Sequence, residues 1–280
     1  MRLAVAGGKG GCGKTLVATS LAVVAHGNTW LLDCDVDAPN AHLYFGEKGK
    51  LLDEVRVEFP SVSAELCTLC GQCGEACRFG AIVPLKEEVL TFPELCISCG
   101  GCALACPAGA IEFKKREVGK LFRASPKEGL TVLTGELAVG EIRAVPVIES
   151  MKRVVEHESP ELVIIDCPPG TSCPVVEAVD GADLCVLVAE PTMSGVHDLA
   201  SSLELVSTLD IPCSVVLNKA ASSHEVEELC ARHNVPILMR IPYDEGIAKV
   251  YSAGVPMASV NGWGAKFEEL LLRIEQEVGS

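Results

Sequence analysis

A glycine-rich loop between an apolar run and an apolar helical segment constrains the fold of this chain more than any other feature. The run at 3–6 leads into a segment whose residues 8–15 read G-x-x-x-x-G-K-T. Glycines let backbone N–H groups approach phosphates, and the start of the helix adds positive potential. We expect Lys14 to bind the β- and γ-phosphates and the Thr15 hydroxyl to bind Mg²⁺. The predicted nucleotide contacts in the loop are Gly8, Lys9, Gly10, Gly11, Cys12, Gly13, Lys14 and Thr15.

The remainder of the chain alternates short apolar runs with helical segments. The predicted strands are 3–6, 30–33, 130–134, 162–166, 184–189, 214–218 and 237–241, and the predicted helices are 14–25, 141–158, 195–209, 225–233, 246–253 and 265–277. Continuous apolar runs indicate strands buried on both faces, and therefore a mainly parallel sheet. The alternation predicts an α/β fold with a doubly wound, mainly parallel sheet.

Eight of the fifteen cysteines lie between Cys67 and Cys106, in two runs with the spacing C-x₂-C-x₂-C-x₃-C. This is the bacterial ferredoxin spacing, in which the fourth cysteine of each run binds the other cluster. The first predicted 4Fe–4S ligand set is Cys67, Cys70, Cys73 and Cys106, and the second is Cys77, Cys96, Cys99 and Cys102. Structural zinc is the alternative, but zinc ribbons pair two C-x₂-C knuckles over a longer gap.

The cysteine-rich stretch interrupts the α/β pattern, because glycine, proline and cysteine replace the alternation between about 60 and 118. We predict a small bacterial-ferredoxin-like domain at 60–118, inserted into a nucleotide-binding domain formed by 1–59 and 119–280. The flanking stretches 55–59 and 111–122 are predicted to be short strands that act as stems.

Charge and hydropathy exclude several classes of partner. The formal net charge of −15 argues against a general nucleic-acid or anionic-membrane binder. No secretory signal is visible, and no apolar run approaches the ~18 residues of a membrane span. These features predict a cytoplasmic protein with reduced thiols and no stable membrane anchor. The last helix is expected to pack on the domain through one apolar face, which carries Phe267, Leu270, Leu271, Ile274 and Val278.

The early lysine of the loop, Lys9, gives the pattern K-G-G-x-G-K-T, which resembles the deviant Walker A motif of the MinD/ParA and nitrogenase iron protein group. Residues 31–35 (LLDCD) resemble the Walker A′ element, and 163–170 (VIIDCPPG) resemble Walker B with switch II. The whole chain resembles MinD/ParA-superfamily P-loop ATPases that carry an inserted two-cluster ferredoxin domain and are related to Mrp-like ATPases.

The resemblance implies a MinD-like fold, slow ATP hydrolysis, two 4Fe–4S clusters and ATP-dependent dimerisation, as a homodimer or with a paralogue. Such proteins occur in anaerobes. Lys9 would reach the partner's nucleotide, Asp35 would handle the attacking water and Asp166 would bind Mg²⁺. Asn218 and Pro242 match the adenine-side loops by short motifs. A helix-capping role is the alternative for Asp33 and Asp166, since both end apolar strands.

The other seven cysteines divide into two groups. We expect Cys12, Cys34, Cys167, Cys185, Cys213 and Cys230 to be small packing residues. Cys173 lies near a position used by the nitrogenase iron protein to bridge its dimer, and its alternatives are a buried or capping thiol and transient metal or thiol chemistry. No C-terminal CPxC motif of the Mrp-like cluster carriers is present.

The leading functional hypothesis is an ATP-gated electron-transfer protein acting on a redox or metal-cluster-binding partner. The alternatives are a metallocluster-assembly or carrier ATPase and a MinD-like positioning ATPase whose clusters sense redox state. Because two oxidised clusters add negative charge to an already acidic chain, we expect the partner to present a basic face.

Overall fold

The computed structural model describes residues 1–279, which form two compact units. Unit 1 comprises Met1–Asp53, Lys120–Leu137 and the chain from Arg143 onward; unit 2 comprises Glu54–Gly119 and Ala138–Ile142. The segment 138–142 lies outside the predicted insert. It belongs to unit 2 because the Ala138 amide donates to the Val118 carbonyl at 3.0 Å and Glu141 pairs with Arg116 at 2.5 Å.

A nine-stranded sheet has the order β11-β10-β9-β1-β8-β2-β7-β6-β3. Its first seven strands are β11 (Ile237–Ile241), β10 (Cys213–Asn218), β9 (Leu184–Ala189), β1 (Arg2–Ala6), β8 (Leu162–Asp166), β2 (Thr29–Asp33) and β7 (Leu130–Leu137). Every pairing from β11 to β7 is parallel. The predicted α/β fold with a mainly parallel sheet is therefore confirmed.

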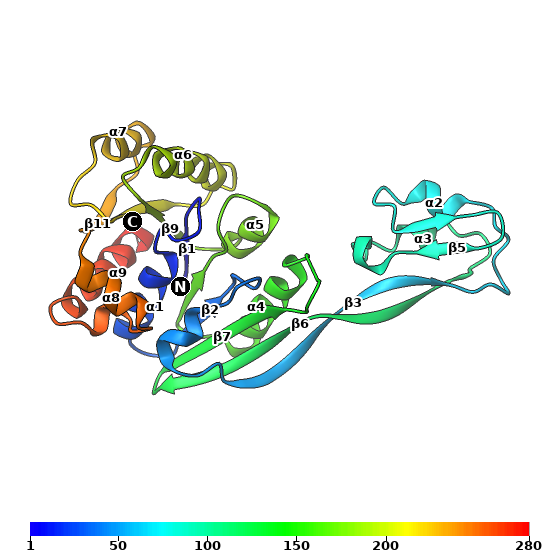
Figure 1. Ribbon diagram of the computed structural model, residues 1–280, viewed down its shortest axis with the longest axis horizontal. Helices are drawn as coiled ribbons and strands as arrows, with labels where there is room; N and C mark the ends of the chain where they lie inside the picture. Colours follow the sequence, from blue (N-terminus) through cyan, green and yellow to red (C-terminus); the bar gives the residue numbers. More distant parts are fainter. Residues whose placement is uncertain (280) are drawn as a thin grey trace. The chain divides into compact units, whose positions relative to one another are not determined.

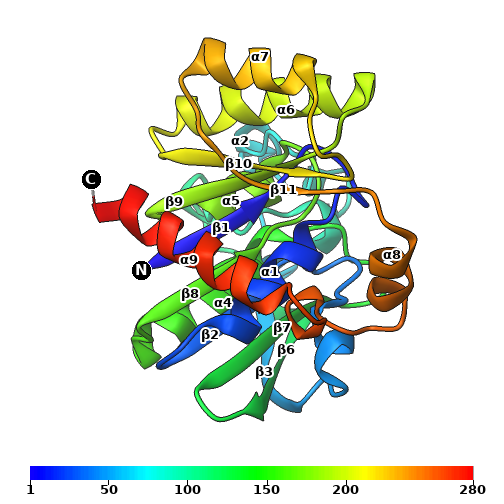
Figure 2. The ribbon, with the colours of Figure 1, turned by 90° about the vertical axis from the view of Figure 1, so that its left-hand side faces the viewer.

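Helices cover both faces of this parallel sheet, since α1 and α9 lie over one face and α4 and α5 over the other (Figure 2). The α-helices of unit 1 are α1 (Lys14–Val24), α4 (Val145–Glu158), α5 (Cys173–Val179), α6 (Met193–Thr208), α7 (His224–His233), α8 (Glu245–Ser252) and α9 (Gly264–Gly279). Two 3₁₀ turns, η1 (Ala41–Phe45) and η3 (Met257–Ser259), complete the unit. Within residues 1–279, no helix has the length and apolarity to cross a membrane.

Two sequence predictions about helices were wrong, and one helix was missed. Helix α4 begins at Val145 rather than at 141, because Glu141 belongs to unit 2 and Pro146 stands in the first turn. The short helix α5 was not predicted. Val278 is 37% exposed, whereas Phe267, Leu270, Leu271 and Ile274 of the same helix are buried as expected.

Unit 2 contains short elements and parts of two long strands. Its elements are α2 (Gln72–Ala76), β4 (Ile82–Pro84), β5 (Val89–Thr91), η2 (Pro93–Leu95) and α3 (Gly101–Leu104), with β4 and β5 paired antiparallel. The predicted stems are longer than expected: β3 spans Lys50–Val62 and β6 spans Ile111–Lys127 (Figure 1). Both strands continue across the boundary between the units.

Candidate nucleotide site and cysteine cavities

The glycine-rich loop follows β1 and ends where α1 begins. Gly11 and Gly13 have φ angles of 79° and 105°, a left-handed conformation that favours glycine. A Cβ atom at Gly13 would lie 2.3 Å from the Asn218 side-chain nitrogen, and one at Gly8 would lie 2.4 Å from the Asp198 Cβ. The loop conformation thus requires glycine for its backbone angles and for the space around it.

The structure brings Lys14, Thr15, Asp35 and Asp166 together. Asp166 ends β8 and is 1% exposed, and neither of its carboxylate oxygens has a partner in hydrogen-bonding geometry among the described residues. Burial raises the pKa of Asp166, while the Thr15 hydroxyl and the Lys14 ammonium oppose that rise. A buried carboxylate without a partner, next to a hydroxyl, fits the oxygen ligands that Mg²⁺ prefers.

The other two carboxylates on these strand ends differ in their surroundings. Burial raises the pKa of the half-buried Asp35, and Lys14 lowers it. One Asp33 oxygen accepts hydrogen bonds from the backbone amides of Asn40 and Ala41, both at 2.8 Å. Asp33 therefore anchors the start of η1, in agreement with the capping alternative for this residue, whereas Asp35 faces the loop lysine.

A carboxylate that the sequence analysis missed, Glu190, links the loop to two neighbouring strands. It follows β9 directly, and its oxygens pair with Lys9 at 2.9 Å and with Lys219 at 2.5 Å. Lys219 also donates to the Gly11 carbonyl at 3.2 Å. The signal was present in the sequence, since Glu190 ends an apolar run as Asp33 and Asp166 do.

The two predicted adenine-side residues lie at the carboxyl ends of neighbouring strands β10 and β11. The Asn218 side chain donates to the Cys12 carbonyl at 2.7 Å, so it fixes the loop backbone in this structure. Pro242 is exposed directly after β11. A role for either residue in binding the base stays a prediction.

In unit 2, the eight clustered cysteines line two separate cavities. Cys67, Cys70, Cys73 and Cys106 line one cavity, and Cys77, Cys96, Cys99 and Cys102 line the other. Each cavity thus contains three cysteines from one run and the fourth cysteine from the other run. This is the division that the ferredoxin spacing predicts.

The two cysteine runs also share a backbone conformation. Leu69 and Ser98, at equivalent positions, are non-glycine residues with φ angles of 55° and 62°. Gly71 and Gly100, which follow the second cysteine of each run, have φ angles of 83° and 75°. A positive φ angle is costly for a residue other than glycine, and Leu69 and Ser98 adopt it at matching places, so the two runs share the same strained turn.

Backbone N–H groups surround several of these sulfur atoms. The Ser98 amide lies 3.4 Å from the Cys96 Sγ, and the Ala110 amide lies 3.3 Å from the Cys106 Sγ. Burial acts to raise the pKa of Cys77, but the N–H groups of residues 79–82 outweigh it, so the pKa is lowered. These N–H groups stabilise a thiolate at Cys77, the form of cysteine that binds metal, whereas burial raises the pKa of Cys73 and that of Cys102.

Within the described chain, no group of three or more His, Cys, Asp or Glu side chains could hold a metal ion. A 4Fe–4S core is a larger object than one ion, and its ligands stand farther apart. The residues fit such a core in number, in thiol chemistry and in their arrangement around two cavities.

The remaining cysteines follow the packing prediction in most cases. Cys12, Cys34, Cys167, Cys185 and Cys230 are buried, and Cys213 is half-buried. Cys173 is exposed in the first turn of α5, where Ser172 is the N-cap residue. The expectation of a buried or capping thiol at Cys173 was therefore wrong.

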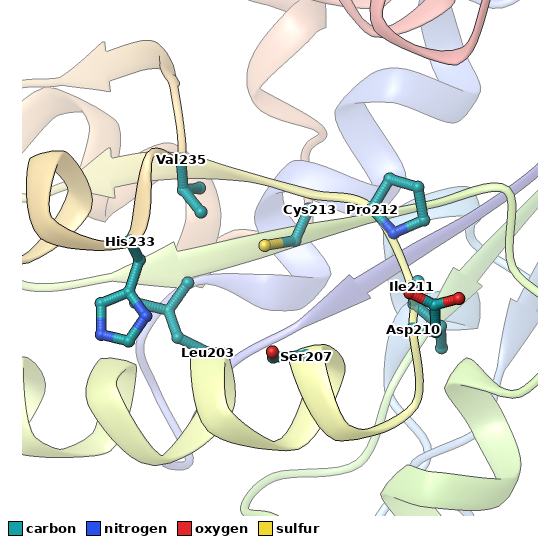
Figure 3. Close-up of a pocket in the computed structure, with 8 residues that line it drawn as sticks. All are labelled: Leu203, Ser207, Asp210, Ile211, Pro212, Cys213, His233 and Val235. Atoms are coloured by element: carbon teal, nitrogen blue, oxygen red, sulfur yellow. The ribbon is translucent and has the colours of Figure 1, made fainter.

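The cavity in Figure 3 lies between α6, α7 and the start of β10. It is lined by Leu203, Ser207, Asp210, Ile211, Pro212, Cys213, His233 and Val235. The glycine-rich loop follows the carboxyl end of β1, which runs parallel to β10 through β9. The cavity thus lies at the amino ends of the strands, opposite to the glycine-rich loop, and none of the predicted nucleotide-binding residues lines it.

Comparison with known proteins gives consistent results. Residues 3–257 match the family model described as CobQ/CobB/MinD/ParA nucleotide binding domain. Two uncharacterised proteins of Methanocaldococcus jannaschii are 38% and 30% identical to the chain, the first over 86% of each chain and the second over 96% of each. The septum site-determining protein MinD from Pyrococcus horikoshii, solved with Mg-ADP, superposes with a TM-score of 0.58 at 18% identity, covering 99% of this chain and 97% of that one.

The family match and the fold agree with the loop geometry and with the strand-end carboxylates around it. The family match spans most of the chain, and the α/β architecture of the chain is that of the MinD structure. The chain therefore belongs to the CobQ/CobB/MinD/ParA family and is a nucleotide-binding P-loop protein of the MinD/ParA ATPase type.

Proposed function

We propose that this protein is an ATP-hydrolysing iron–sulfur protein in which nucleotide-driven dimerisation controls electron transfer with a partner redox or metal-cluster protein. The observation that carries the proposal is the division of eight cysteines between two cavities, three from one run and one from the other in each. Zinc sites offer no reason for this exchange of the fourth cysteine, whereas the two-cluster ferredoxin arrangement requires it.

In the nucleotide unit, Lys14 binds the β- and γ-phosphates, and Thr15 and Asp166 hold Mg²⁺. The metal, when bound, neutralises charge that develops on the transferred phosphoryl group. Asp35 lies near Lys14 and orients the attacking water. The Mg-ADP bound to the P. horikoshii MinD supports ATP as the nucleotide.

Dimerisation uses Lys9, which contacts the nucleotide of the partner chain. The partner is a second copy or a paralogue. Two relatives of this chain in one organism, M. jannaschii, support the paralogue version. Closing and opening of the dimer would change the access of a redox partner to unit 2.

In unit 2, the two cysteine sets hold two 4Fe–4S clusters, which supply one-electron chemistry. Each cavity would supply four thiolates to its cluster, and this full set of ligands favours fixed electron carriers over cargo. Backbone N–H groups near Cys77, Cys96 and Cys106 stabilise the charge on the sulfurs and tune the potential.

The first test is the metal content of protein purified without oxygen. We expect about eight iron and eight sulfide per chain, with electron paramagnetic resonance signals of two reduced clusters. Cys70→Ser and Cys99→Ser should each weaken one cluster, whereas Cys173→Ser, an exposed cysteine outside both sets, serves as the control. Zinc in place of iron, or equal losses in the control, would refute the proposal.

The second test separates electron transfer from cluster assembly. The clusters are titrated with and without Mg-ATP, and the loaded protein is mixed with an apo-ferredoxin acceptor. A nucleotide-dependent change in potential or in the partner's reduction rate supports electron transfer. Transfer of iron and sulfide to the acceptor would instead identify an assembly or carrier protein, and a nucleotide-insensitive titration would exclude the coupling.

A further inference from the structure

A buried glutamate directly after β9 holds two lysines beside the glycine-rich loop. The Glu190 side chain is 8% exposed, and the Lys9 and Lys219 side chains are 31% and 46% exposed. The three residues come from the loop after β1 and from the ends of β9 and β10, neighbouring strands in the order β10-β9-β1. The two lysines are therefore tied to one carboxylate that water hardly reaches.

The contact between Lys9 and Glu190 is incompatible with the role proposed for Lys9. At 2.9 Å, the Lys9 ammonium is fixed inside its own chain, with the Thr192 hydroxyl 3.5 Å away. To contact the nucleotide of a second chain, the ammonium must leave Glu190. The dimer thus competes with an internal ion pair for the same lysine.

The second lysine makes this release feasible. Removing the only partner of a buried carboxylate is strongly destabilising, because an uncompensated charge remains. Glu190 keeps Lys219 at 2.5 Å after Lys9 leaves, and Lys219 is itself held by the Gly11 carbonyl at 3.2 Å. The ion pairs keep the pKa of Glu190 low against the effect of burial, so the carboxylate is ionised at neutral pH.

We propose that Glu190 is a positioning residue that retains Lys9 within its own chain and thereby sets the ATP concentration at which two chains associate. This inference rests on the nucleotide-driven dimer of the proposed function. In this proposal Glu190 acts on Lys9 through their 2.9 Å ion pair and not on the reacting groups.

The test compares Glu190→Gln with the wild-type chain, by analytical ultracentrifugation across an ATP titration. The charged hydrogen bond between Glu190 and Lys9 stabilises the unassociated chain. Its loss should therefore lower the ATP concentration for half-maximal dimer roughly fivefold to tenfold. Glu190→Asp, which keeps the charge on a shorter side chain, should lower it by about twofold and serves if the glutamine variant does not fold. Glu177→Gln is the matched control, because Glu177 pairs with Lys152 at 3.1 Å elsewhere in unit 1.

A general electrostatic effect is separated by repeating the substitution in a Lys9→Ala background and measuring ATP affinity by calorimetry. A retaining role predicts that Glu190→Gln tightens ATP binding less in that background than in the wild type. An equal gain in ATP affinity in the wild-type and Lys9→Ala backgrounds would overturn the inference. An unchanged ATP concentration for half-maximal dimer would also overturn it. If the wild-type chain does not dimerise with ATP at all, the failure belongs to the proposed dimer switch and not to Glu190 alone.

Discussion

The two units of this protein build their sites in different ways. The nucleotide site of unit 1 lies at the carboxyl ends of neighbouring parallel strands, on a sheet with a large aliphatic core. Unit 2 builds its cavities from short local runs, and its buried apolar residues are few and mostly small: Val55, Cys73, Ala81, Ile82, Cys96, Ala110 and Val118. The comparison indicates that unit 1 is stable through its core, and we therefore expect the stability of unit 2 to depend on the clusters proposed for its cysteines.

The largest expected effect tests this dependence directly. Removal of iron with a chelator should speed amide hydrogen exchange in residues 60–110 by at least about a hundredfold, because ligand binding supplies the folding free energy that a small core lacks. Exchange in β1, β8 and β9 is the internal control and should be unchanged. If the amides of iron-free unit 2 stayed protected from exchange, unit 2 would not depend on its clusters for stability.

Asp35→Ala tests whether unit 2 keeps its iron when ATP hydrolysis in unit 1 is lost. We expect the ATP hydrolysis rate to fall by about 10²- to 10³-fold, since the water would no longer be oriented. Iron content should not change. A Lys14→Ala variant should also lose hydrolysis and keep its clusters, so iron loss in either variant would show that the units are not separable as proposed.

Asp166→Asn should separate stability from activity in unit 1. Among the described residues, no group meets the buried wild-type carboxylate in hydrogen-bonding geometry, and an amide of the same shape carries no charge for burial to penalise. We expect the unfolding temperature of the nucleotide-free protein to rise by about 2–4 °C at neutral pH, with loss of Mg²⁺-dependent hydrolysis. A lowered unfolding temperature would mean that the carboxylate has a structural partner.

The smallest effect concerns the left-handed leucine of unit 2. Leu69→Asn should stabilise the cluster-loaded protein by about 0.5–1 kcal/mol, because asparagine tolerates a φ angle of 55° better than leucine does. Protection of residues 60–80 from hydrogen exchange measures the gain. Thr68→Asn, at a neighbouring position outside the positive-φ group, is the control and should give no such increase.

Local patterns made much of this structure predictable. Aliphatic runs buried on both faces revealed seven strands of unit 1, and glycine, lysine and threonine at fixed spacing revealed the loop before α1. Cysteine spacing alone divided eight thiols into the two sets that line the cavities. In each case the signal lies within a short window of sequence.

The rest depended on contacts between distant segments. Glu190 lies 181 residues from Lys9 along the chain (190 − 9), and only the strand order β10-β9-β1 brings them together. The assignment of 138–142 to unit 2 likewise depends on its contacts with residues of β6. Helix α5 escaped prediction because it has only seven residues, too few for a helical period to be recognised.

The interchange of the fourth cysteine between the two runs has a consequence for how unit 2 is loaded. Since Cys106 lines the cavity of the first run and Cys77 that of the second, each proposed cluster would link the two cysteine runs. Binding of the first cluster would place a ligand for the second, so loading becomes cooperative. Under limiting iron, the population would then consist of empty and fully loaded chains, and half-loaded chains would be rare.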